Sequence, residues 1–262
     1  MKRRTFLQRS GLAFPGAAAV LAADRVEPTA ESVLITSAHT RLAPILAAGL
    51  GKQYRPVLTA AQEIRTEHEW RRGDPLDETT TADLVRGIGA IVHLAEPPAS
   101  ASTAAQVDVR TRATYNLLQA AAAAGVTRAI YISSLDVMQG HGERFAVTED
   151  WRPEPTTAAG AMSHWLGECT CREFARQGSI SIVALRFGRL VGEEEAGGKP
   201  ADRPWLAESD AVQAVRLSLD YLRKRTSPAD RWTVFHILAA GCPRFPISKA
   251  ERLLGYRPEF RS

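Results

Sequence analysis

Residues 31–44 read ESVLITSAHTRLAP, and this stretch decides the fold that we predict for the chain. The largely apolar run over 32–36 is typical of a strand that is buried on both faces. A short polar turn follows, and residues 42–50 predict a helix that Gly49 and Gly51 close. Pro44 suits its first turn, where a missing N–H costs nothing. The stretch therefore predicts a strand, a tight turn and the start of a helix.

Strand and helix signals alternate along the rest of the chain. Strands are expected at 55–58, 69–71, 89–94, 128–133, 181–185 and 234–238, and helices at 77–87, 107–124, 161–177, 210–224 and 249–254. Alternation with apolar strands predicts an α/β fold, a doubly wound parallel sheet covered by helices on both faces. We predict a core over 24–190 and a small C-terminal region over 191–262 that packs on its substrate side.

The N-terminus predicts export. A charged start, KRRTFLQR, precedes the run GLAFPGAAAVLAA, which is too short to span a bilayer permanently. The arginine pair resembles a twin-arginine signal peptide, which we assign to residues 1–23. We therefore expect a periplasmic or otherwise extracytoplasmic protein with no stable membrane span after signal removal. The alternative is an uncleaved N-terminal helix.

Charge and cysteine content exclude several functions. The net charge of +4 equals the four cations of the signal segment, and the rest of the chain has equal numbers of basic and acidic residues. Without a basic stripe, nucleic-acid binding is not expected. The three cysteines, Cys169, Cys171 and Cys242, are too few and odd in number for a disulfide framework. We interpret them as packing residues and expect no metal site.

Several segments carry a family resemblance over residues 32–258. They read RRGDPLD after the third strand, AIVHLAEPP at the fourth, YNLLQAAAAAGVTRAIYISS over the long helix and fifth strand, and VALRFGRLVG at the sixth. This text resembles the extended short-chain dehydrogenase/reductases, the epimerase/dehydratase group, and the compact tail resembles the uronate-dehydrogenase-like branch. The resemblance implies a Rossmann-type sheet, NAD or NADP as cofactor and a sugar-like substrate. It also implies a homodimer through the helices at 107–124 and 161–177.

The resemblance also implies where a dinucleotide would bind. The implied residues are Ser37, Ala38, Thr40, Arg41 and Leu42 in the turn, Asp74 and Pro75 near the adenine, and Leu94, Ala95 and Glu96 beneath the cofactor. The family's turn has three glycines, which here are Ser37, Thr40 and Ala43. Because glycine tolerates positive φ and close approach of phosphate, we expect weakened binding, with Thr40 the poorest fit. A purely structural turn is the alternative. No acid follows the second strand, so the sequence does not distinguish NAD from NADP.

The family's catalytic set is a Ser, a Tyr and a Lys. Ser134 matches the Ser, but Tyr-x-x-x-Lys falls on Gly160 and His164, or in another register on Ala159 and Ser163. No tyrosine lies between positions 131 and 221, and no lysine between 52 and 199. We therefore expect conventional activity to be absent, as in a pseudoenzyme that binds a ligand or partner. The alternative is an active oxidoreductase that uses a non-standard acid/base such as His164, whose ordinary pKa is about 6.5.

Overall fold

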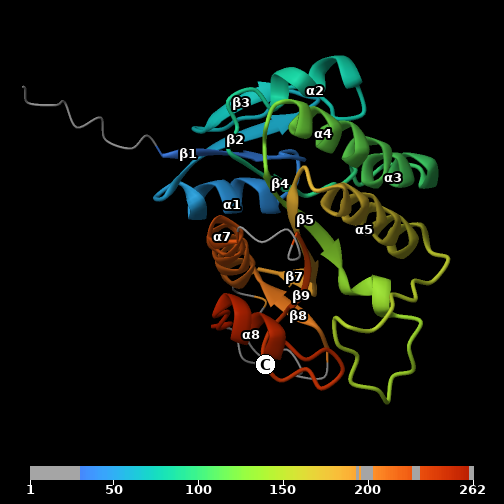
Figure 1. Ribbon diagram of the computed structural model, residues 1–262. Coiled ribbons are helices and arrows are strands. Elements are labelled where there is room, and N and C mark those ends of the chain that lie inside the picture. Colours follow the sequence, from blue (N-terminus) through green and yellow to red (C-terminus); the bar gives the residue numbers. More distant parts are fainter. Residues whose placement is uncertain (1–29, 193–194, 196–202, 226–230, 260–262) are drawn as a thin grey trace, which may run out of the picture.

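The structure is a computed structural model that describes residues 30–192, 195, 203–225 and 231–259. Its centre is a parallel seven-stranded sheet in the order β3-β2-β1-β4-β5-β6-β9 (Figure 1). The strands are β1 (Glu31–Ile35), β2 (Tyr54–Ala60), β3 (Glu69–Arg72), β4 (Ala90–His93), β5 (Arg128–Ser134), β6 (Ser181–Phe187) and β9 (Trp232–Ile237). The order reverses between β1 and β4, as in a doubly wound Rossmann-type sheet. The predicted α/β fold is confirmed.

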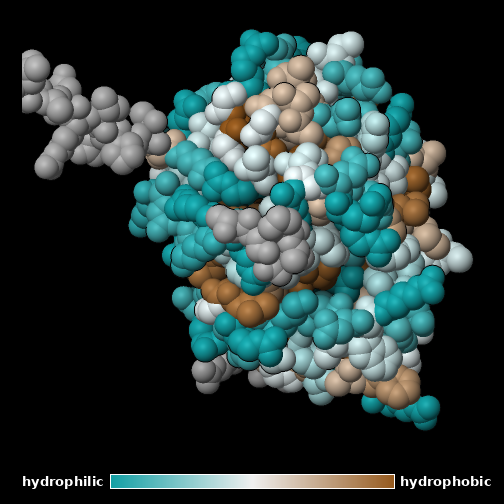
Figure 2. Space-filling view, viewed as in Figure 1, coloured by the Kyte–Doolittle hydropathy of each residue, from teal (hydrophilic) through white to brown (hydrophobic). Residues whose placement is uncertain are grey.

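Helices cover both faces of this sheet (Figure 1). One face carries α1 (Leu42–Leu50) and α7 (Glu208–Lys224), and the other carries α2 (Glu78–Leu84), α4 (Arg112–Ala123) and α5 (Ala159–Gln177). Two apolar layers result, one on each side of the strands, which explains why the strands read as continuous apolar runs. Figure 2 shows that the surface in the same view is mostly hydrophilic, with small apolar areas.

The predicted long helix over 107–124 is wrong in its start and its continuity. The chain forms α3 (Thr103–Arg110), breaks at Thr111, and continues as α4. The hydroxyl of Thr111 donates to the carbonyl of Val107 at 2.7 Å, and that of Thr114 to the carbonyl of Arg110 at 2.8 Å. Such bonds to the preceding turn bend helices. Ser102 begins α3 because its Oγ accepts the N–H of Ala105.

The C-terminal region contributes to the sheet as well as packing on it. β9 pairs with β6, and α8 (Ser248–Leu254) packs on α7 and β9. β7 (Arg189–Val191) and β8 (Trp205–Ala207) form a separate parallel pair. The sequence analysis missed this pair because three-residue strands are too short to show a pattern. The predicted signal segment over 1–23 and most of the polar loop over 192–203 lie outside the described residues.

Two further observations concern cysteines and membranes. None of the three cysteines forms a disulfide; Cys171 and Cys242 are buried and Cys169 is partly buried, in line with a packing role. Within the ranges given above, no helix is both long and apolar enough to cross a bilayer. The same residues contain no group of three or more His, Cys, Asp or Glu side chains able to hold a metal ion.

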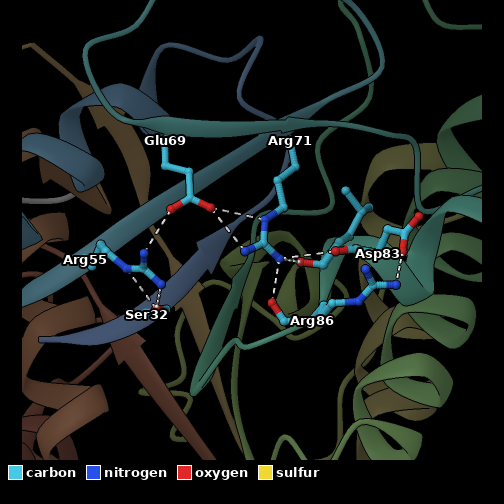
Figure 3. A network of polar contacts seen from close by, with 7 residues as sticks. Ser32, Arg55, Glu69, Arg71, Asp83 and Arg86 are labelled. Carbon is cyan, nitrogen blue, oxygen red and sulfur yellow. Dashed lines mark hydrogen bonds and ion pairs between the residues drawn. The ribbon is translucent and has the colours of Figure 1, made fainter. Parts of the chain in front are cut away.

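A polar network joins the amino-terminal ends of β1, β2 and β3 and extends to α2 (Figure 3). Arg55 donates to the Oγ of Ser32 at 2.6 Å and pairs with Glu69 at 3.3 Å, which ties β1, β2 and β3 together. Arg71 pairs with Glu69 and donates to the carbonyls of Asp83, in the last turn of α2, and of Arg86, just after the helix. A cation at a helix C-terminus satisfies its free carbonyls. This network holds the β3 edge in place.

Helix α5 packs on β5 through Gly167, and this contact gives a test of the fold. A Cβ at Gly167 would overlap the hydroxyl of Tyr131 and lie 2.7 Å from the carbonyl oxygen of Arg110. Gly167→Ala is therefore expected to lower the free energy of unfolding by about 1–3 kcal/mol, since an overpacked core must shift. Urea unfolding measures the change. Gly160→Ala is the matched control in the same helix, where a Cβ would meet no atom within 4 Å. Equal destabilisation by both variants would contradict the close packing at Gly167.

Candidate functional site

A cavity of about 320 Å³, the β1–β4 cavity, opens at the carboxyl ends of β1, β2 and β4. It is lined by Thr36, Ser37, His39, Thr59, Ala60, Ala61, Gln62, Gly73, Asp74, Pro75, His93, Glu96, Pro98, Ser100, Val109 and Ala113. Four of the implied cofactor residues line it, namely Ser37, Asp74, Pro75 and Glu96. The cavity lies at the point where the strand order reverses, which is where open α/β sheets bind ligands.

The turn after β1 keeps a glycine-like conformation without glycine. Ser37 has φ 55°, in the left-handed region, and its Oγ accepts the N–H of Glu96 at 3.1 Å. Thr40 donates both its N–H and its hydroxyl to the carbonyl of Ser37, at 3.0 and 2.8 Å. Its hydroxyl is thus turned back onto the turn, and Thr40 does not line the cavity. Holding a non-glycine residue in this region costs on the order of 1–3 kcal/mol.

The start of α1, which follows the lining residue His39, offers backbone donors. The N–H of Ala38 is used by the carbonyl of Thr59 at 2.9 Å. In the part of the chain that the structure describes, the N–H groups of Arg41, Leu42 and Ala43 have no backbone acceptor. Free N–H groups at a helix N-terminus attract anions. The exposed guanidinium of Arg41 pairs with Glu208 at 2.5 Å and so links the first turns of α1 and α7.

A buried histidine joins the strand ends beneath the cavity. Nδ1 of His93 lies 2.8 Å from the hydroxyl of Thr36, and Nε2 lies 3.0 Å from that of Thr114. Because the Thr114 hydroxyl donates to the Arg110 carbonyl, it must accept from Nε2–H. Nδ1 then accepts from Thr36, which itself accepts the N–H of Leu94. His93 is neutral in this chain of bonds, and burial lowers its pKa to about 3.

The two residues proposed for catalysis lie in different surroundings. Ser134 ends β5, is partly exposed, and accepts the N–H of Asp136 at 3.1 Å, which begins the short helix η1 (Leu135–Met138). His164 is buried in α5, and its Nδ1 has no partner among the described residues. Burial, with a smaller contribution from the charge of Arg110, lowers the pKa of His164 to about 3. The imidazole is therefore neutral at pH 7 and a weak base.

Arg110 supplies a buried cation next to the start of α5. Its side chain is only 6% exposed; Nη1 donates to Oγ of Ser163 at 3.2 Å, and Nη2 to Oε2 of Glu96 at 2.9 Å. Ser163 is one of the two positions at which the family resemblance implies a lysine. Positive charge at that place thus comes from α3 instead of α5. Sequence reasoning missed Arg110 because no pattern connects it with residues 53 positions away.

A second buried charge cluster lies behind Ser134. Arg186 of β6 donates to both carboxylate oxygens of Glu168, at 2.9 and 2.7 Å, and Ser133 donates to Oε1 at 2.6 Å. The two charged side chains are 3% and 1% exposed. This bidentate pair fixes α5 against β5 and β6. Neither Arg186 nor Glu168 lines the β1–β4 cavity, which indicates a structural role.

A larger cavity of about 810 Å³, the arginine cavity, adjoins the end of β5. Leu135, Asp136 and Gln139 line it from one side, and three loops contribute the rest, namely Glu143–Ala146, Arg203–Pro204 and Pro243–Phe245. The three arginines of the lining outnumber its two acids, Asp136 and Glu143. Since Leu135 and Asp136 directly follow Ser134, this cavity neighbours the position implied for catalysis.

The walls of the arginine cavity are fixed by Arg244. Its Nη2 donates to the carbonyl of His141 at 2.8 Å, and its guanidinium lies 5.2 Å from the ring centre of Phe245. On the facing loop, Arg144 lies 5.0 Å from the ring centre of Phe145. Cation–π contacts of this kind hold guanidinium groups in place. The cavity can therefore offer ordered positive charge to a polar ligand.

The chain is similar in sequence to a known protein family and to a characterised sugar dehydrogenase. Residues 42–208, well over half of the chain, match the NAD dependent epimerase/dehydratase family. The match starts just after the turn in which Ser37 and Thr40 replace glycine. A curated relative, the L-arabinose 1-dehydrogenase (NAD(P)(+)) of Haloferax volcanii, is 26% identical over 216 residues, covering 72% of this chain and 81% of that protein.

Solved structures of the same architecture include two uronate-oxidising enzymes. Glucuronic acid dehydrogenase from Chromohalobacter salexigens has a TM-score of 0.75 at 18% identity, covering 88% of this chain and 85% of its own. A uronate dehydrogenase variant from Agrobacterium tumefaciens in complex with NAD has a TM-score of 0.75 at 20% identity, covering 87% and 84%. At these identities the likeness establishes the fold. Together with the family match, it means that this chain is a member of the NAD dependent epimerase/dehydratase family.

Proposed function

We propose that this protein binds NAD or NADP in the β1–β4 cavity and a sugar-like ligand in the arginine cavity, without the family's usual proton transfer. The observation that carries the proposal is that the turn after β1 keeps its backbone conformation and free N–H groups, whereas helix α5 has lost the family's catalytic residues. The N–H groups at the start of α1 have no backbone acceptor among the described residues, and the turn that precedes them lines the β1–β4 cavity through Ser37 and His39. Helix α5, in contrast, contains neither tyrosine nor lysine.

The residues around the β1–β4 cavity fit a dinucleotide. The backbone N–H groups of Arg41 and Leu42 would hold its pyrophosphate. Asp74 and Pro75 would contact the adenine end, where the carboxylate of Asp74 already accepts the N–H of Leu76 at 2.9 Å. Ser37 adopts the required backbone conformation, so the missing glycine weakens the cradle without removing it. When bound, a nicotinamide cofactor supplies or accepts a hydride.

The start of α5 lacks a group suited to proton transfer near neutral pH. The pKa of His164 is lowered to about 3, chiefly by burial. Burial raises the pKa of the thiols of Cys169 and Cys171 on the same helix. General acid–base catalysis raises reaction rates roughly 10²–10⁴-fold. Helix α5 lacks the tyrosine and lysine that would supply this increase. These observations favour ligand binding over the alternative, an active dehydrogenase that uses His164.

The arginine cavity favours a sugar that carries negative charge. The lining contains three arginines, Arg144, Arg203 and Arg244, and two acids. The cavity volume of about 810 Å³ is larger than the volume of one sugar ring. Arginine recognises carboxylate and phosphate groups through paired N–H donors. The named relatives act on a neutral pentose and on uronates. The charge of the lining supports the second class for this protein.

Export and dimerisation complete the proposal. Residues 1–23 would direct the folded chain through twin-arginine export, with the dinucleotide bound before transport. Tyr115 of α4 and Leu166 of α5 are large, exposed apolar side chains on the two helices through which the family resemblance implies a dimer. Their exposure supports a homodimer through this face. Light scattering after gel filtration measures the mass directly.

The proposal predicts dinucleotide binding without hydride transfer. The full chain, loaded with NAD or NADP, is expected to give no absorbance change at 340 nm above background with L-arabinose, D-glucuronate or D-galacturonate. His164→Ala is expected to leave this result and NADH affinity unchanged, because a buried neutral imidazole takes no part. Turnover that disappears in His164→Ala would instead establish the oxidoreductase alternative.

A further inference from the structure

We propose that Glu96, held in place by Arg110, binds the hydroxyl groups of a ribose in the β1–β4 cavity. The inference rests on the proposed function and names the chemistry of one contact within it. Glu96 lines the cavity, and its side chain is 46% exposed. It therefore presents a carboxylate to whatever enters.

The backbone at this point is held in a strained conformation. Ala95 is fully buried and has φ 50°, in the left-handed region that favours glycine. The next N–H, that of Glu96, is fixed by the Oγ of Ser37 at 3.1 Å. Strain of this kind persists only where the surroundings enforce it, and it gathers at ligand sites. Here the strained backbone and the bond to Ser37 fix the position of Glu96 beside the turn that follows β1.

One oxygen of this carboxylate is occupied and the other is available. Oε2 accepts from Nη2 of Arg110 at 2.9 Å, while Oε1 accepts no hydrogen bond from any described residue. Arg110 is itself anchored by its bond to Ser163 and is almost fully buried. The carboxylate is thus held through one oxygen, and its second oxygen is an acceptor without a partner among the described residues.

The chemistry of the cavity favours hydroxyl groups at this position. A carboxylate accepts hydrogen bonds from hydroxyls and repels phosphate, and such charge-assisted bonds are about twice as strong as neutral ones. The lining contains a second carboxylate, Asp74, and no lysine or arginine. Phosphates would instead meet the N–H groups of α1. The free oxygen of Glu96 therefore suits a vicinal diol.

ADP-ribose tests the inference, since it contains both riboses of the dinucleotide without the nicotinamide. Calorimetric titration of the full chain is expected to give a dissociation constant roughly 10–100-fold higher for Glu96→Gln than for the wild type, because a bond to a charged acceptor is lost. Glu63→Gln is the matched control, with the same change of charge at an exposed residue next to Gln62 of the lining. It is expected to change affinity less than about twofold.

The same titration with ADP, which lacks the terminal ribose, locates the contact. A loss shared by both ligands assigns Glu96 to the adenosine ribose, and a loss confined to ADP-ribose assigns it to the terminal ribose; either supports the inference. Unchanged or tighter binding by Glu96→Gln, with the wild type binding normally, would overturn the inference alone. A wild type that binds neither ligand would overturn the proposed function and the inference with it.

Discussion

Replacing Glu168 by glutamine is expected to lower the free energy of unfolding by about 3–5 kcal/mol. The substitution keeps the shape of the side chain but leaves the guanidinium of Arg186 buried without a counter-charge. Both groups are almost completely inaccessible, and Ser133 is the further hydrogen-bonding side chain on the carboxylate. Removing one partner of a buried pair exposes the full desolvation cost of the other. Guanidinium chloride unfolding at pH 7.5 measures the loss.

Asp83→Asn is the matched control for this prediction. Asp83 pairs with Arg86 at 2.5 Å, but the two side chains are 71% and 79% exposed. Exposed pairs contribute little, so we expect a change within about 0.5 kcal/mol. If Glu168→Gln were as mild as Asp83→Asn, the bidentate pair would not be the anchor of α5 on β5 and β6.

Mild acid is expected to unfold the protein through three buried histidines. Burial lowers the pKa of His93, His164 and His236 in the folded chain to about 3, whereas the unfolded chain titrates near its ordinary value of about 6.5. Between these values the unfolded state binds more protons. Stability is therefore complete above about pH 6.5 and falls as pH decreases towards 3. Three such groups give a slope of up to about 4 kcal/mol per pH unit.

His236 separates this effect from general acid unfolding. Both of its ring nitrogens lack a partner in the described part of the chain, and the charges of Arg186 and Lys249 add to the effect of burial. His236→Leu is expected to remove about one third of the stability lost between pH 7.5 and pH 5, measured by urea unfolding. His39→Gln, at an exposed histidine, is expected to leave the pH dependence as it is in the wild type. The same slope in both variants would refute the role of His236.

Most of the fold follows from the sequence because β1, β4, β5 and β6 are apolar runs bounded by turn residues. The unit at 31–44 is observed as β1, the turn and α1, and later strands differ by only a few residues at their ends. The break at Thr111 was not predicted, because an alanine-rich helix hides the effect of two threonine hydroxyls. β7 and β8 are defined by pairing between residues 16 positions apart, which no local pattern records.

The residues of the candidate site also fall into two groups: those that the sequence identified, and those that only the folded chain brings together. Ser37, Asp74, Pro75 and Glu96 were identified through the family resemblance, and they do line one cavity at the carboxyl ends of the strands. The partners of His93 lie 57 and 21 positions away, so its bonds to Thr36 and Thr114 become visible only in the folded chain. The three arginines of the arginine cavity likewise come from three separate loops. His164 was a candidate base from its position alone, and its burial could not be read from the helix pattern.

Titration of NADH into the purified full-length protein tests the central claim most directly. We propose that a dinucleotide binds at the free N–H groups of α1 and in the β1–β4 cavity, even though Ser37, Thr40 and Ala43 replace glycine. We therefore expect saturable binding of one NADH or NADPH per chain, with a shift in nicotinamide fluorescence and displacement by ADP-ribose. Absence of binding by either dinucleotide at millimolar concentration would contradict this proposal.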